Sequence, residues 1–248
     1  MKTGIQISSL KPLLLTSGQV REACARIAAM DGGAVQLQWI DPAVPIGDIA
    51  AAMEENGLIS LGTQDFYQVV EQNEEYYVNL NAATGGRWLT VSRIPEVCKS
   101  REGLDRFVSR LRAMQARLEP LGQVLCFHPV TADFQAVPGM DAVEYLLQAM
   151  PELQLCLDLF HLNRNCRNMP AFIRRYAGRI PMVHFKDSDP AGKLVPAGQG
   201  TVSWQGVVQA CLDAGVCWGL AEQESWDRDP YDCLGEALAW LGRELNQS

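Results

Sequence analysis

The chain has 248 residues, of which 48% are apolar and 20% charged, a composition typical of a globular fold rather than a disordered segment. The formal net charge of −8 argues against a nucleic-acid-binding protein, which normally carries a basic patch. No apolar run is long enough to cross a membrane, and the first residues lack an export signal. The eight scattered cysteines favour a reducing cytoplasm over disulfides or zinc–thiolate sites. We therefore expect a cytoplasmic protein without a membrane or nucleic-acid partner.

Short apolar runs alternate with longer amphipathic stretches along the chain. The predicted strands are 4–8, 34–39, 58–63, 87–92, 124–128, 153–158, 182–186 and 218–223. The predicted helices are 20–30, 46–55, 101–121, 141–150, 169–176, 204–214 and 231–245. Eight strands alternating with helices predict an α/β fold, a parallel (β/α)8 (TIM) barrel, as one domain over residues 1–248. No Gly-x-Gly-x-x-Gly follows the first strand, which argues against a doubly wound sheet.

Polar residues at the carboxyl ends of the strands are the candidates for a site, because the active sites of such barrels lie there. The three histidines, His128, His161 and His184, follow the fifth, sixth and seventh predicted strands or lie at their ends. Asp158 ends the sixth strand and Glu222 lies at the end of the eighth. A single histidine of this kind is as often a structural residue, but three histidines with two acids favour a functional site.

Imidazole and carboxylate ligands around one ion suit manganese, zinc, cobalt or iron and do not discriminate well among these metals. A bound ion with open positions polarises a carbonyl group and makes the neighbouring C–H bond more acidic. A carboxylate beside the ion removes that proton, and a second group returns a proton elsewhere. The residues therefore predict one divalent metal ion and enolisation chemistry, which means isomerisation, epimerisation or loss of water next to a ketone.

Five segments together resemble one family of barrels. They are 4–10, Asp158-x-x-His161, His184-Phe185-Lys186-Asp187, Gly198-Gln199-Gly200 and Glu222-Gln223-Glu224. In order and spacing they resemble the xylose-isomerase-like barrel family, which includes sugar isomerases, epimerases and inosose dehydratases. The trailing Asp229-Pro230 is similar to the dehydratase-like branch of that family.

The resemblance implies roles for individual residues. Asp158, His184 and Glu222 would bind the metal ion, Glu222 would also take part in proton transfer, and His161 would contact the substrate. Relatives supply a further glutamate ligand from the region of strand five, where this chain has Asp133, whose side chain is one methylene shorter. Either Asp133 binds the ion and shares in the proton transfer, or the site has three protein ligands, or His128, otherwise a substrate contact, completes it.

Four other residues have two interpretations each. Lys186 binds a substrate oxygen or acts as an acid, or it makes only structural polar contacts. Glu224 shares a strand face with Glu222 and is a candidate for substrate binding, or the strand ends before it and it lies outside the site. Arg164 and Arg167, in the polar loop after strand six, receive an anionic group of the substrate or lie in solvent.

The sequence thus predicts a divalent-metal-dependent isomerase or epimerase of a small sugar or keto-polyol. One alternative is a dehydratase that acts on a cyclic keto-polyol, as inosose dehydratases do. Another is a barrel that binds a sugar without catalysis, because Asp133 is shortened. A DNA-repair endonuclease of this fold is disfavoured, since it requires more histidines and acids and a basic face. Barrels of this kind commonly form dimers, so a homodimer is one of the alternatives for this chain.

Overall fold

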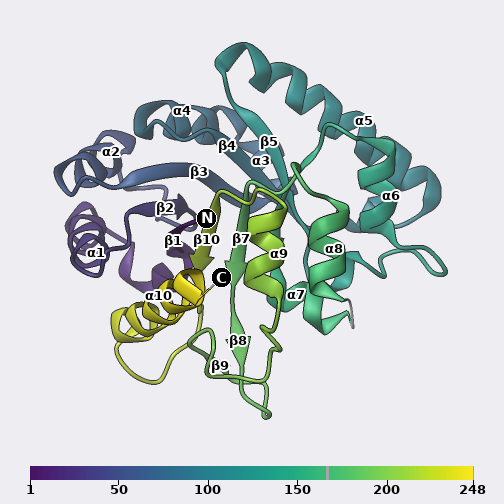
Figure 1. The fold of residues 1–248 in the computed structure, drawn as a ribbon. Coiled ribbons are helices and arrows are strands. Elements are labelled where there is room, and N and C mark those ends of the chain that lie inside the picture. Colours follow the sequence, from purple (N-terminus) through teal and green to yellow (C-terminus); the bar gives the residue numbers. More distant parts are fainter. Residues whose placement is uncertain (166–167, 248) are drawn as a thin grey trace.

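Eight parallel strands close into a barrel in the computed structural model, which describes residues 1–165 and 168–247 (Figure 1). Strands that follow one another in the ring are paired, and β1 pairs with β10 to close it. The strands are β1 (Lys2–Gln6), β2 (Ala34–Leu37), β3 (Ile59–Phe66), β4 (Trp88–Ser92), β5 (Val124–His128), β6 (Gln154–Asp158), β7 (Met182–Phe185) and β10 (Trp218–Ala221). The predicted parallel (β/α)8 barrel is confirmed.

Helices connect the strands and surround the barrel (Figure 1). They are α1 (Ser17–Ala29), α2 (Ile46–Glu55), α3 (Tyr67–Gln72), α4 (Glu74–Thr84), α5 (Arg101–Leu118), α6 (Ala142–Ala149), α7 (Leu159–Arg164), α8 (Met169–Arg175), α9 (Val207–Asp213) and α10 (Pro230–Gln247). The 3-10 helices are η1 (Ile7–Leu13), η2 (Glu96–Cys98), η3 (Glu119–Leu121) and η4 (Thr131–Asp133). The short strands β8 (Asp187–Ser188) and β9 (Leu194–Val195) pair in a small antiparallel hairpin. Within the described ranges, no helix is long and apolar enough to cross a membrane.

The connection from β3 to β4 contains α3 and α4, for which we predicted no helix. The buried side chains of α4 are those of Tyr77, Leu80 and Asn81, and Asn81 is polar. Asn81 donates a hydrogen bond from Nδ2 to Oε1 of Gln123, so part of the buried face is held by polar contacts. A helix without a continuous apolar stripe gives little periodic signal. Tertiary contacts, rather than amphipathic pattern, stabilise this segment.

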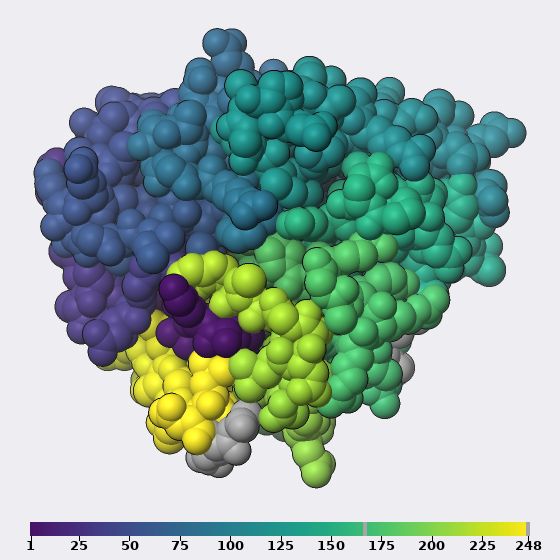
Figure 2. All heavy atoms as spheres, turned by 45° about the horizontal axis from the view of Figure 1, so that its top comes forward, coloured from purple at the N-terminus to yellow at the C-terminus, as the bar shows by residue number. Residues whose placement is uncertain are grey.

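The amino terminus lies at the surface, against the C-terminal helix. Figure 2 shows the first residues (purple) between α10 (yellow) and the yellow-green segment that leads into β10. Lys2 pairs with Trp218 at the start of β10, and the Lys2 amide donates to the carbonyl of Cys217 at 2.8 Å. Because β1 and β10 both begin at this end, all carboxyl ends of the parallel strands lie at the opposite end of the barrel.

The barrel interior is layered, and the layers position the site. One layer is apolar and consists of Ala34, Leu61, Cys126, Cys156, Met182 and Leu220. Two residues further along the chain from Cys126, Cys156, Met182 and Leu220 are His128, Asp158 and His184, on β5, β6 and β7, and Glu222, directly after β10. Residues two apart on a strand point to the same face. These four side chains therefore form the next layer toward the carboxyl ends.

Candidate active site

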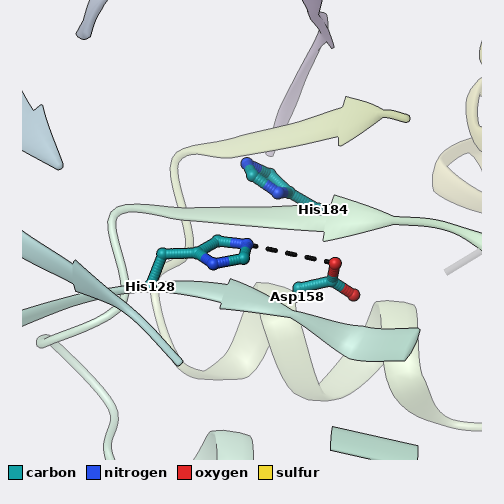
Figure 3. A group of neighbouring side chains, drawn as sticks. All are labelled: His128, Asp158 and His184. Carbon is teal, nitrogen blue, oxygen red and sulfur yellow. Dashed lines mark ion pairs between the residues drawn. The ribbon is translucent and has the colours of Figure 1, made fainter. Parts of the chain in front are cut away.

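Three potential metal ligands converge inside the barrel: His128 from β5, Asp158 from β6 and His184 from β7 (Figure 3). One ligand atom from each lies within 4.8 Å of the others, and His128 Nε2 is 3.9 Å from Asp158 Oδ2. All three are buried. Among the described residues, neither ring nitrogen of His128 nor Oδ2 of Asp158 has a hydrogen-bond partner. Buried polar atoms are normally satisfied, so these atoms fit a bound cation.

Glu222 extends this group through His184. Its Oε2 lies 3.0 Å from Nδ1 of His184, while its Oε1 accepts a hydrogen bond from Ser8 Oγ at 3.3 Å. The other ring nitrogen of His184, Nε2, is 2.7 Å from Oε1 of Gln36. An amide oxygen only accepts, so Nε2 donates and Nδ1 faces Glu222. Gln36 thereby fixes the ring orientation in which Nδ1 is directed at the centre, as the outer partner of a metal-binding histidine does.

The ammonium group of Lys186 lies among three carboxylates. Its Nζ is 3.0 Å from Glu224 Oε1, 3.4 Å from Asp158 Oδ2 and 3.9 Å from Glu222 Oε2. When all are ionised, three carboxylates and one ammonium leave a formal charge of −2, of which a proton on His184, whose pKa is raised, offsets one unit. Uncompensated buried charge is costly, and a divalent cation would neutralise it.

Two of these carboxylates remain ionised and the third titrates near neutrality. Burial raises the pKa of Asp158 and Glu222, but the charges of Lys186 and the neighbouring histidines together outweigh it and hold the pKa of Asp158 below, and that of Glu222 well below, the usual range. Burial lowers the pKa of Lys186, yet the neighbouring carboxylates raise it above the ordinary value. In Glu224, burial and the charge of Glu222 raise the pKa to about 7. Such a value suits a group that takes up and releases protons near neutral pH.

The three histidines differ in protonation. Burial and the adjacent His184 lower the pKa of His128 to about 3, so its ring is neutral and offers a lone pair to a metal ion. Burial also lowers the pKa of His161. Burial acts the same way on His184, but Cys156 and Glu222 outweigh it and raise the pKa of His184 well above its usual value. A cation bound at Nδ1 would compete with the proton held there.

A cavity of about 650 Å³ lies beside this centre, and its wall includes His161, Lys186 and Glu224. The volume is in the range of small-molecule sites, roughly 300–1,000 Å³. Asp158 begins α7 because its Oδ1 accepts hydrogen bonds from the amides of Phe160 and His161. His161 is therefore on the first turn, with Nε2 3.6 Å from Asp158 Oδ2 and Nδ1 2.8 Å from Thr131 Oγ1. His161 thus lies between the cavity and the buried carboxylate.

The carboxylate of Asp133 is bonded to backbone amides and not to the residues of the buried centre. Its Oδ1 accepts a hydrogen bond from the Ile94 amide at 2.9 Å, and its Oδ2 accepts one from the Val130 amide at 2.8 Å. Burial raises the pKa of Asp133 to about 6, although these bonds act in the opposite direction. The short side chain thus ends on backbone amides and joins the loop after β4 to the loop after β5. We therefore replace Asp133 by His128 in the proposed ligand set.

The Gly-x-Gly stretch has a structural role in the loop between β7 and α9. The buried carboxylate of Asp187 accepts hydrogen bonds from the backbone amides of Ser188, Gly198, Gly200 and Val202 and from the indole of Trp204. A Cβ atom at Gly200 would lie 2.2 Å from Asp187 Oδ1, so only glycine fits there. None of these residues belongs to the cavity wall. The motif therefore shapes the loop rather than supplying a reacting group.

Several neighbours of the site were not singled out from the sequence. Ser8 contacts Glu222, Thr131 contacts His161, and Arg93 lines the cavity. Each lies within three residues of a strand's carboxyl end, so counting every polar residue in that window would have found them. The guanidinium of Arg164 lies 5.6 Å from the ring centroid of Phe160, outside the cavity wall. Arg167 lies outside the described residues.

Comparison with known families agrees with the fold and with the resemblance of the motifs. The profile of the xylose isomerase-like TIM barrel family matches residues 43–244. The chain belongs to this family. A comparison with curated proteins gave no significant match.

Solved structures of several enzymes share the barrel at low sequence identity. A sugar phosphate isomerase/epimerase from Parabacteroides distasonis is 14% identical with a TM-score of 0.81, and the match covers 96% of this chain and 92% of that one. An L-ribulose 3-epimerase is 16% identical with a TM-score of 0.77, over 100% of this chain and 95% of that one. A probable 3-DHS dehydratase from Bacillus anthracis is 13% identical with a TM-score of 0.74, over 98% and 99%. At these identities the likeness establishes the fold.

Proposed function

We propose that this protein is a divalent-metal-dependent isomerase or epimerase of a small sugar or keto-polyol. The observation that carries the proposal is the buried layer of His128, Asp158, His184 and Glu222, which borders a cavity of substrate size. The layer lies at the carboxyl ends of the barrel strands, where barrels of this type hold their chemistry. The epimerase and the isomerase/epimerase among the structural relatives are consistent with this class of reaction.

The four residues of this layer would hold the ion. Two imidazoles and two carboxylates suit manganese, zinc, cobalt or iron. The neutral ring of His128, the ionised Asp158 and Glu222, and the buried negative charge around Lys186 all favour a divalent cation. When bound, the ion would polarise a substrate carbonyl and increase the acidity of the adjacent C–H bond.

We assign the proton transfer to Glu224. Its side chain is 29% exposed and lines the cavity, whereas that of Glu222 is 4% exposed and contacts His184. Glu224 therefore takes over the proton transfer that the resemblance gave to Glu222. Lys186, which also lines the cavity and donates to Glu224 at 3.0 Å, would bind a substrate oxygen and hold the carboxylate in place. His161 would orient a hydroxyl group of the substrate.

The proposal is tested by metal analysis together with exchange of solvent deuterium into a panel of ketoses. We expect a transition metal in the purified protein, and deuterium incorporation at the carbon next to the carbonyl. Glu224→Gln should reduce the exchange rate about 100- to 10,000-fold, the usual contribution of a general acid or base, while the metal content stays unchanged. Glu55→Gln, an exposed glutamate on α2, is the matched control and should leave both unchanged.

Three outcomes would change the assignment. A protein that neither contains nor binds a metal contradicts the metal-dependent reaction. Formation of an absorbing enone from a keto-polyol would favour a dehydratase, the reaction class of the relative from Bacillus anthracis. Saturable sugar binding without any exchange would favour a barrel that binds sugars without catalysis.

A further inference from the structure

Three cationic side chains, Arg93, Lys99 and Lys186, line the cavity. Two of them have acidic partners. Lys186 contacts the carboxylates of the buried centre, and Lys99 Nζ lies 2.7 Å from Glu96 Oε2. The remaining acid of the wall, Asp133, is bonded to backbone amides. In the part of the chain that the structure describes, Arg93 forms no ion pair, and the nearby carboxyl of Asp133, whose pKa the charge of Arg93 lowers, is already bonded to backbone amides.

The backbone of Arg93 is strained, and its side chain is supported from one side. Arg93 has φ 65°, in the left-handed region that residues other than glycine rarely adopt. Its guanidinium carbon lies 4.0 Å from the ring centroid of Phe66, the last residue of β3. Stacking on a ring leaves the N–H groups at the edge of a guanidinium free to donate. Strained residues concentrate at ligand-binding sites, where the surrounding structure holds them in place.

Hydrogen bonds to Asp133 hold the backbone next to Arg93 in place. The amide of Ile94, directly after Arg93, donates to Asp133 Oδ1, while the Val130 amide donates to Oδ2. Asp133 is 1% exposed, so both bonds are protected from water. The turn that presents Arg93 is thereby fixed to the neighbouring loop, while its exposed side chain is held by the stacking on Phe66.

We propose that Arg93 binds an anionic group of the substrate, a carboxylate or a phosphate, in the cavity where the proposed function places the reaction. A guanidinium offers several N–H donors in one plane, which match the oxygens of either group. The carbonyl end of the substrate would face Lys186 and Glu224, and the anionic end would face Arg93. The inference rests on the proposed function for the carbonyl end, and it selects acidic sugars or sugar phosphates over neutral sugars as the substrate class.

Calorimetric titration of the metal-loaded protein with three ketoses tests this inference. The probes are D-fructose, D-fructose 6-phosphate and D-fructuronate, which carry at C6, far from the carbonyl, no charge, a phosphate and a carboxylate. We expect at least one anionic probe to bind more tightly than fructose. In Arg93→Met this preference should fall about 10- to 100-fold, the range of one hydrogen bond to a charged group, while fructose binding stays unchanged. The probe that loses affinity identifies phosphate or carboxylate as the recognised group.

A matched variant and an independent readout make the result specific. Arg21→Met removes the same charge from an exposed arginine of α1 that pairs with Glu55, and it should leave all three affinities unchanged. The inference is overturned if neither anionic probe binds, if neither binds better than fructose, or if Arg93→Met keeps the preference. Cobalt binding by Arg93→Met should equal that of the unaltered protein. If the unaltered protein itself binds no metal ion, the proposed function is contradicted instead.

Discussion

Two groups of acidic residues lie at the carboxyl ends of the strands, and they are bonded in different ways. Asp158, at the end of β6, and Glu222, directly after β10, lie within 4 Å of Lys186 and of histidine rings. Asp133 and Asp187, in the loops after β5 and β7, accept their hydrogen bonds from backbone amides or from an indole. Both groups are buried.

The difference in bonding partners distinguishes carboxylates that can take part in a reaction from carboxylates that only stabilise loops. A carboxylate surrounded by other titratable side chains retains an atom that can bind an ion or move a proton, and Asp158 Oδ2 is such an atom. A carboxylate whose oxygens are all occupied by N–H donors holds loops together. Burial and residue type alone do not distinguish these two roles, whereas the identity of the hydrogen-bond partners does.

The largest expected effect contrasts one acid from each group. Asp158→Asn should lower cobalt affinity on the order of 1,000-fold, beyond the 10- to 100-fold typical of outer residues, because a direct ligand is lost. Asp133→Asn, the matched control, should change cobalt affinity less than about 3-fold. Titrations followed by the visible absorption of cobalt measure both. Equal losses in the two variants would contradict the distinction.

The next largest effect concerns stability. Asp187→Asn should lower the free energy of unfolding by roughly 2–4 kcal/mol, because an amide nitrogen would face N–H donors in a buried place. Urea unfolding measures the change. Asp189→Asn in the same loop is the control and should cost less than about 1 kcal/mol, since asparagine accepts backbone hydrogen bonds in such turns. A stable Asp187→Asn protein would show that the loop does not depend on this carboxylate.

The pH dependence of stability tests the environment of Asp133. Its pKa in the folded protein is about 6, raised from 3.8, so the folded state holds the proton more tightly than the unfolded chain. This contribution to stability is present below pH 4 and is lost as the pH rises through 6, by about 2 to 3 kcal/mol. Asp133→Asn cannot titrate, so the stability of the unaltered protein relative to the variant should fall between pH 4 and 7. A constant difference in urea-unfolding free energies over this range would contradict the burial of an ionisable Asp133.

The smallest expected effect concerns Gln36, which orients His184 at 2.7 Å. Gln36→Leu should weaken cobalt binding about 10- to 100-fold, because the ring loses the partner that fixes its hydrogen on Nε2. Gln38→Leu removes another buried glutamine, one that accepts from Gln64, and should leave cobalt affinity unchanged. An equal response to the two substitutions would assign Gln36 to packing alone.

The sequence by itself determined the barrel and one side of the candidate site. Alternating apolar runs and amphipathic stretches depend on local spacing, and seven of the helical connections carried that signal, whereas α4 with its buried Asn81 did not. Asp158 and His184 could be placed near each other because the ends of parallel strands meet at one end of a closed barrel.

Only the tertiary structure decided which polar atoms remain available. Asp133 follows β5 much as Asp158 ends β6, and nothing in the local sequence shows that its oxygens are taken by amides from two loops. The same holds for Arg93, whose left-handed backbone and stacking on Phe66 depend on residues from other strands. Hydrogen bonding between distant segments is set by the approach of whole loops, and the spacing of residues along one segment does not carry that information.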